Sequence, residues 1–125
     1  MDRIVNGYGA KKANSKLLPQ SYEIKKIAPK EVVVEISHCG ICYSDIHLID
    51  NDWGISNYPF IPGHEIVGCV TQKGSQVKNL KIGQRVGIGW FSKVCEKCTY
   101  CKTDRDNMCG SPEMTAVGRN GGFAD

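Results

Sequence analysis

Four cysteines lie close together in the last third of the chain, at Cys95, Cys98, Cys101 and Cys109. Their spacing is C-x2-C-x2-C-x7-C, and the residues between them are rich in Lys, Thr and Asp, which does not suit a buried apolar cluster. Thiolates this close in sequence can converge on one tetrahedral Zn²⁺ when the chain between them forms short turns. The spacing therefore predicts a structural zinc lobe at about residues 90–110.

Three alternatives to zinc stay open for these thiols. Disulfides need an oxidising compartment, and we see neither a signal peptide nor an even number of cysteines. An iron–sulfur cluster usually takes C-x2-C-x2-C-x3-C-P, whereas the last gap here is seven residues and Gly110 follows it. The third alternative, unligated thiols, is uncommon at this density.

A second group of potential ligands and acid–base residues comes from two earlier segments. It comprises Cys42, Ser44, Asp45 and His47, followed by His64 and Glu65. A thiolate, an imidazole and carboxylates are donors of an open, catalytic metal site, in which one position is left for a substrate. Each residue alone has a plainer explanation, because a lone His is more often a satisfied polar residue and a lone Cys a small hydrophobic one.

The composition is that of an ordinary globular domain. The chain has 125 residues, of which 41% are hydrophobic and 23% charged, enough to build one core. The net charge is only +3 and the basic residues are scattered, so we expect no nucleic-acid partner. No apolar run approaches the roughly 18 residues of a membrane span, so we expect no membrane insertion and a cytoplasmic location.

Short strands must position these side chains. Alternating apolar residues predict strands over residues 3–10, 21–27, 31–38, 65–73 and 84–88. Residues 11–20 and 51–62 are expected to be loops, since both contain proline. Residues 42–50 predict a short helix, because Ile46 and Ile49 fall at helical spacing. Strands joined by short loops, with one small helix, indicate a mainly β, barrel-like domain.

Three motifs together resemble the zinc-dependent medium-chain alcohol dehydrogenases. The run HCGICYSDIH at residues 38–47 resembles the first zinc segment of that family. Residues 63–77 are similar to its signature G-H-E-x2-G-x5-G-x2-V, and the cysteine run resembles its structural-zinc lobe in all three spacings. The motifs follow the family's order over about residues 33–110 and look most like the cinnamyl-alcohol and yeast-type branches. The resemblance implies a GroES-like (chaperonin-10-like) β-barrel over residues 1–125.

The resemblance also implies the ligands of two zinc ions, one structural and one catalytic. The four cysteines of the lobe match the structural ligands. Cys42 and His64 match ligands of the catalytic zinc, and Glu65 matches a nearby carboxylate that can swing toward the metal. Asp45 matches the acid that orients the ligand histidine through its far ring nitrogen. Cys39 matches no ligand position and is expected to be a packing residue.

Further residues match positions that handle the substrate and the cofactor. Ser44 matches the hydroxyl, and His47 the outer base, of a relay that removes the proton of a zinc-bound alcohol. Trp53 and Trp90 match aromatic walls of a substrate pocket, although large aromatic residues are also buried for packing alone. Tyr43 stands where related enzymes often carry His or Arg facing the cofactor's pyrophosphate, so its phosphate contact would lack a positive charge.

The activity that the resemblance implies is the reversible oxidation of a small alcohol to an aldehyde or ketone with NAD or NADP. The sequence lacks a G-x-G-x-x-G after a strand and lacks the third cysteine ligand of the catalytic zinc. We therefore expect a catalytic-domain fragment without its Rossmann domain, inactive alone, whose full-length form could be a homo-oligomer. The alternative is a non-enzymatic zinc-stapled β-barrel binding module, which would have no use for the second group of residues.

Overall fold

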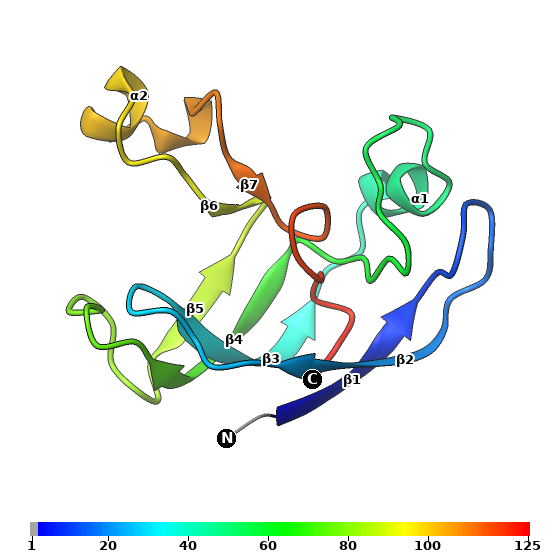
Figure 1. The fold of residues 1–125 in the computed structure, drawn as a ribbon, viewed down its shortest axis with the longest axis horizontal. Helices are drawn as coiled ribbons and strands as arrows, with labels where there is room; N and C mark the ends of the chain where they lie inside the picture. The colour runs from blue at the N-terminus through cyan, green and yellow to red at the C-terminus, as the bar shows by residue number, and fades with distance from the viewer. Residues whose placement is uncertain (1–2) are drawn as a thin grey trace.

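The computed structural model describes residues 3–125, so the first two residues of the predicted 1–125 domain lie outside it. Its strands form three small antiparallel sheets (Figure 1). The first sheet pairs β1 (Arg3–Gly9) with β2 (Leu18–Ile24). The second has three strands in the order β3 (Val32–Cys39), β4 (Ile66–Lys73) and β5 (Arg85–Ile88). The third pairs β6 (Phe91–Lys93) with β7 (Glu113–Met114). The mainly β architecture agrees with the sequence prediction.

Most predicted elements are found within one residue of their expected bounds, but the second strand is not. β2 starts at Leu18, so the prediction of a loop over residues 11–20 and a strand over residues 21–27 was wrong there. Pro19 lies inside β2 and pairs with Tyr8 of β1. Because β2 has a neighbour on one side only, it is an edge strand, where proline is tolerated.

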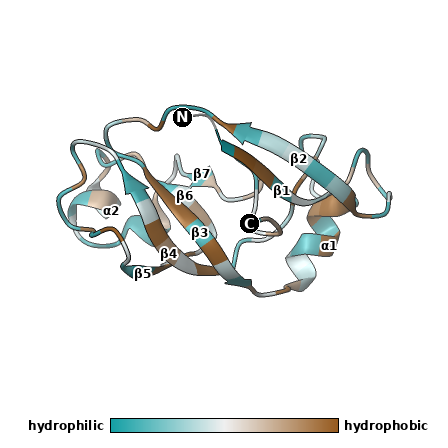
Figure 2. Ribbon diagram, turned by 90° about the horizontal axis from the view of Figure 1, so that it is seen from below, coloured by the Kyte–Doolittle hydropathy of each residue, from teal (hydrophilic) through white to brown (hydrophobic). Residues whose placement is uncertain are grey.

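The zinc lobe contains more regular structure than the sequence predicted. Between β6 and β7 the chain forms α2 (Thr99–Lys102) and a 3₁₀ turn, η1 (Asp106–Met108). Each of these elements has four residues or fewer, too short to show a hydrophobic period. Figures 1 and 2 both place the lobe at one end of the molecule and helix α1 (Tyr43–Ile49) at the other.

Helix α1 packs on the core through a different face from the one that its sequence suggested. Leu48 is fully buried, whereas Ile46 is 45% exposed. The inward face pairs Leu48 with Asp45, three residues earlier, so a buried polar residue takes a position where an apolar one is normally expected. Leu48 packs with Phe60 and Ala116 in a small buried cluster, and Figure 2 shows further apolar residues along β1, β3 and β4.

The last residues of the chain bond both to β1 and to the segment that leads into β4. The amide of Tyr8 donates to the Phe123 carbonyl at 2.9 Å, and the amide of Gly122 donates to the Gly63 carbonyl at 2.9 Å. Gly63 has φ +106°, and a Cβ there would lie 2.8 Å from the Cys39 sulfur and from the Gly122 nitrogen. Only glycine fits this conformation and this space.

No helix in residues 3–125 is long and apolar enough to cross a membrane.

Candidate metal centres

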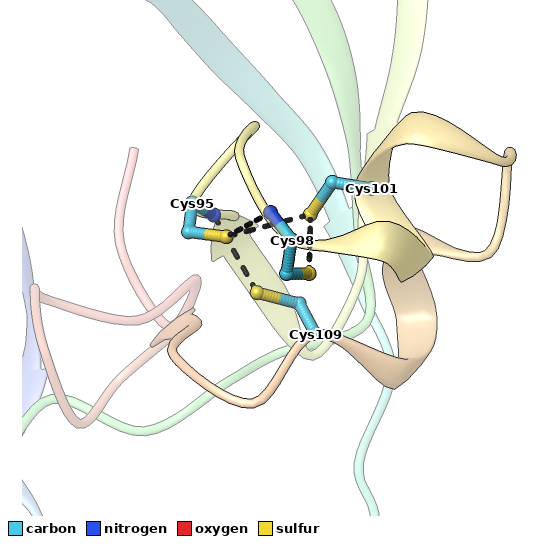
Figure 3. A group of neighbouring side chains, drawn as sticks. All are labelled: Cys95, Cys98, Cys101 and Cys109. Atoms are coloured by element: carbon cyan, nitrogen blue, oxygen red, sulfur yellow. Dashed lines mark hydrogen bonds between the residues drawn. The ribbon is translucent and has the colours of Figure 1, made fainter.

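The four cysteines of the lobe converge as a metal cage requires (Figure 3). Their sulfur atoms all lie within 4.8 Å of one another, with Cys95 and Cys101 3.8 Å apart and Cys98 and Cys101 3.5 Å apart. A tetrahedron with Zn–S bonds of about 2.3 Å has sulfur–sulfur edges of about 3.8 Å. A disulfide would hold two sulfurs at about 2.05 Å, and all seven cysteines are free. The donor set therefore fits one zinc ion.

Backbone amides of the lobe's own turns hold two of these sulfurs. Cys95 Sγ accepts hydrogen bonds from the amides of Lys97 at 3.4 Å and Cys98 at 3.3 Å. Cys109 Sγ accepts from the amides of Cys95 at 3.5 Å and Ser111 at 3.4 Å. The sulfurs are thus held by amides that belong to the lobe itself, three of them within three residues of the sulfur and one, from Cys95, across the lobe.

The same arrangement shifts the pKa values of two of the thiols in opposite directions. The amides of Lys97 and Cys98 lower the pKa of Cys95 to about 6, because they stabilise its thiolate. Burial, followed by the hydrogen bond with Cys98, raises the pKa of Cys101 to about 12. Four thiolates this close repel one another, so a bound cation is needed for all of them to ionise together.

The second group brings together residues that are distant in the sequence. Cys42 is the N-cap of α1, and His64 and Glu65 immediately precede β4. One donor atom from each lies within 4.8 Å of the others. The His64 side chain is buried, Cys42 is half-buried and Glu65 is exposed. Within residues 3–125, this triad and the four lobe cysteines are the two groups of at least three potential ligands that meet this distance.

Asp45 ties the two ligand-bearing segments together. Its carboxylate is only 2% exposed, and its two oxygens accept hydrogen bonds from the amides of Cys42 at 3.0 Å and Gly63 at 3.1 Å. The capping bond to Cys42 also closes the first turn of α1. Asp45 therefore fixes the backbone beside both candidate ligands at once.

His64 has a buried ring nitrogen whose hydrogen-bonding capacity is not met by the protein. Its Nδ1 lies 3.2 Å from Asp45 Oδ1, but the angles miss those of a hydrogen bond, so Nδ1 has no hydrogen-bond partner in the described residues. A metal at the other nitrogen, Nε2, would leave Nδ1 as the donor facing the carboxylate, an arrangement common among metal-bound histidines. Thiolate, imidazole and carboxylate donors also suit zinc, so the residues present fit the ion.

Ser44 and His47 lie three residues apart on α1, on a different face from the buried Asp45 and Leu48. The His47 ring contacts Tyr43 edge to face at 5.0 Å and stacks on Trp53 at 5.3 Å between centroids. Its Nδ1 lies 2.7 Å from Asp52 Oδ2.

Asp52 was missed by the sequence reasoning. It lies past the end of α1, and only the turn that bonds its amide to the His47 carbonyl at 2.9 Å brings it back to the ring. An acidic residue five positions after a candidate base was the available signal.

The two predicted pocket tryptophans lie beside different residues. The Trp90 ring meets the His64 ring edge to face at 4.9 Å and packs on the buried cluster of Leu48, Phe60 and Ala116. Trp53 is 47% exposed and covers His47 instead. The two rings therefore lie next to the candidate metal ligand and the candidate base respectively.

Cys39 is half-buried and lies outside both ligand groups found in residues 3–125. Burial raises the pKa of its thiol, which disfavours the thiolate that a metal would need. This environment agrees with the packing role expected from the sequence.

Comparison with known proteins identifies the family. Residues 28–125 match the model of the alcohol dehydrogenase GroES-like domain. The chain belongs to this family. The resemblance seen in its motifs and the predicted GroES-like, mainly β fold are both confirmed.

Members of the family with similar sequences are alcohol dehydrogenases and reductases. The chain is 43% identical over 122 residues to the aldehyde reductase AdhA of Synechocystis, covering 98% of this chain and 36% of that protein. It is 41% identical over 108 residues to a probable cinnamyl alcohol dehydrogenase 7/8 of Picea abies, covering 86% of this chain and 30% of that protein.

Solved structures of the family are similar over nearly the whole chain. A Helicobacter pylori CAD complexed with NADP(H) superposes with a TM-score of 0.90 at 31% identity, covering 99% of this chain and 38% of that one. The cinnamyl alcohol dehydrogenase SbCAD4 of Sorghum bicolor gives 0.89 at 35% identity, with 98% and 37% covered. The chain thus spans between 30% and 38% of the length of these relatives.

Proposed function

We propose that this chain is the zinc-binding catalytic domain of an alcohol dehydrogenase that interconverts an alcohol with an aldehyde or ketone, using NAD or NADP. The observation that carries the proposal is the meeting of Cys42, His64 and Glu65 donor atoms within 4.8 Å, beside a buried Asp45. The printed names of the relatives support it, since they include an aldehyde reductase, cinnamyl alcohol dehydrogenases and an NADP(H) complex.

Cys42 and His64, with Glu65 as a third donor, would hold the catalytic zinc, while the four lobe cysteines would hold a structural one. When bound, the catalytic zinc supplies a Lewis acid that polarises the substrate oxygen and lowers the pKa of an alcohol. Trp90, packed against the His64 ring, would form a wall beside the substrate and keep water from that side of the site.

The chain's own residues would move the proton of the alcohol. Ser44 would accept the proton of the substrate hydroxyl and pass a proton on to His47. The nicotinamide, when bound, would accept the hydride from the carbon that carries this hydroxyl. Asp52, 2.7 Å from His47 Nδ1, orients the ring and stabilises the imidazolium that forms. In the reverse direction the same two residues return a proton to the carbonyl oxygen.

Binding of the nicotinamide cofactor would need a further, nucleotide-binding domain, with Tyr43 offering a hydroxyl toward it. Tyr43 is 71% exposed at the start of α1, which leaves this hydroxyl accessible to such a partner. We propose that the 125-residue chain alone does not turn over alcohol. Robust alcohol-dependent formation of NADH or NADPH by the purified chain would overturn this part of the proposal.

The metal content of a His64→Ala variant tests the proposed function. We expect two zinc equivalents per chain in the wild type and one in the variant, because the lobe ligands are untouched. His38→Ala is the matched control, since His38 is an exposed histidine whose ring is hydrogen-bonded to Ser37 and lies outside both ligand groups of the described residues, so both equivalents should stay bound. The alternative, a zinc-stapled binding module, requires one equivalent in all three proteins.

A further inference from the structure

Glu65 is the exposed member of the triad, so burial does not by itself hold its carboxylate beside Cys42 and His64. The antiparallel ladder of β3 and β4 ends at the pair Cys39–Ile66. Immediately beyond it, the Gly40 amide donates to the Glu65 carbonyl at 2.8 Å, so Gly40 and Glu65 form the next cross-strand pair. Side chains opposite each other in such a pair extend from the same face.

Gly40 has no side chain, and the Glu65 carboxylate occupies the space that a side chain at position 40 would fill. A Cβ built on Gly40 would overlap Glu65 Oε2 and would lie 3.1 Å from its Cβ and 3.3 Å from its Cδ. All three nearest atoms thus belong to the Glu65 side chain. Gly40 does not have a positive φ, so the position requires glycine for space and not for backbone conformation.

We propose that Gly40 is a positioning residue that lets the Glu65 carboxylate lie within ligand distance of Cys42 and His64. The proposal rests on the proposed function, because it assumes a divalent metal at this triad. A methyl group at position 40 would displace the carboxylate at its flexible end and spare the backbone, since this φ is open to any residue. The metal would then lose its third protein donor while the fold persisted.

A cobalt titration with a double-mutant cycle tests this role. The proteins are the wild type, Gly40→Ala, Glu65→Ala and the double variant, each titrated with Co²⁺ and followed by thiolate-to-cobalt absorption. His64→Ala supplies the spectrum of the lobe alone. We expect each single variant to weaken the second site about tenfold, as loss of one supporting carboxylate does at other metal sites. The double variant should bind like Glu65→Ala alone, because Gly40 acts only through Glu65.

Gly87→Ala is the matched control, since a Cβ on this β5 glycine would meet only Ile66 O, at an ordinary 3.6 Å. It should bind cobalt like the wild type, and circular dichroism should show all variants folded. Wild-type affinity in Gly40→Ala would overturn the positioning role, as would a further tenfold loss on adding Gly40→Ala to Glu65→Ala. A wild type that binds no more cobalt than His64→Ala would instead overturn the proposed function, and this inference with it.

Discussion

The two candidate metal centres are built on different length scales. In the lobe, the ligands run from Cys95 to Cys109, and amides of adjacent residues aim the sulfurs. In the second centre, Cys42 caps a helix and His64 precedes a strand, and the buried Asp45 carboxylate accepts hydrogen bonds from the backbone beside both. The lobe is therefore organised by its own turns, and the second centre by the folded domain around it.

Because of this difference, we expect the two metal ions to contribute differently to the folding of the protein. A short loop with little core of its own depends on its ion for order, because metal-binding free energy becomes folding free energy there. The second centre is held by buried hydrogen bonds and by packing on the cluster of Leu48, Phe60 and Ala116. We expect loss of zinc to disorder the lobe and to leave the second centre folded.

Replacing Cys98 by Ser should give the largest effect, since it removes one of four ligands from a site that orders the loop. We expect loss of one zinc equivalent, rapid tryptic cleavage at Lys97 and Lys102, and a fall in stability of at least about 3 kcal/mol, roughly 10 °C or more in Tm. Elemental analysis, a proteolysis time course and a thermal melt measure the three quantities.

Cys69→Ser is the control for that experiment, because Cys69 is an exposed cysteine of β4 outside both ligand groups. It should keep the zinc content and the proteolytic resistance of the wild type. If chelator does not change the cleavage rate of the wild-type lobe, the lobe is ordered without metal and the contrast between the two centres fails.

Replacing Asp45 by Ala should harm the second centre and spare the lobe. The variant leaves the amides of Cys42 and Gly63 without their acceptor in the protein interior, which should cost about 2–4 kcal/mol in the free energy of unfolding. The second metal equivalent should be lost as well, because both ligand segments are released. Urea denaturation and elemental analysis measure these effects.

Asp50→Ala is the matched control, since Asp50 is the C-cap at the opposite end of the same helix and does not bond to either ligand segment through its side chain in the described residues. It should change stability by well under 1 kcal/mol. Asp45→Ala with wild-type stability and two zinc equivalents would show that Asp45 does not join the two segments.

The sequence predicts the two centres to different extents, because the ligands of the lobe are close together in the chain and those of the second centre are not. The lobe could be predicted from spacing alone, because its ligands and the turns that aim them are local. The meeting of Cys42 with His64 could be expected only through the family resemblance, since nothing local brings the two segments together. Asp52 was missed although it lies only five residues after His47, because the turn that returns it to the ring lies beyond the end of the predicted helical pattern.

The errors in the fold prediction have local physical causes as well. Pro19 suggested a loop, but an edge strand tolerates proline and β2 includes it. Ile46 suggested the inward face of α1, but a buried Asp45 takes that face together with Leu48. Hydrophobic periodicity cannot reveal a helix that buries a carboxylate to support a site.

The pH dependence of zinc binding to the lobe should give the smallest and most specific effect. Cys95, whose pKa is lowered from 9.0 to about 6, is already a thiolate at neutral pH and loses no proton to the metal. Cys101, whose pKa is raised, must lose its proton when zinc binds. Zinc affinity should therefore rise at least about tenfold per pH unit between pH 6.5 and 8, and fall more steeply below pH 6, where Cys95 is also protonated.

A chelator competition in the His64→Ala background measures this dependence, because only the lobe then binds zinc. The stability of the metal-free chain should also depend on pH through the same thiol. Since the folded-state pKa of Cys95 lies below its ordinary value, its contribution to stability is present above that value and is lost as the pH falls toward 6. A zinc affinity that does not change between pH 6.5 and 8 would mean that Cys101 is already ionised in the metal-free chain. The four lobe cysteines would then be thiolates before zinc binds.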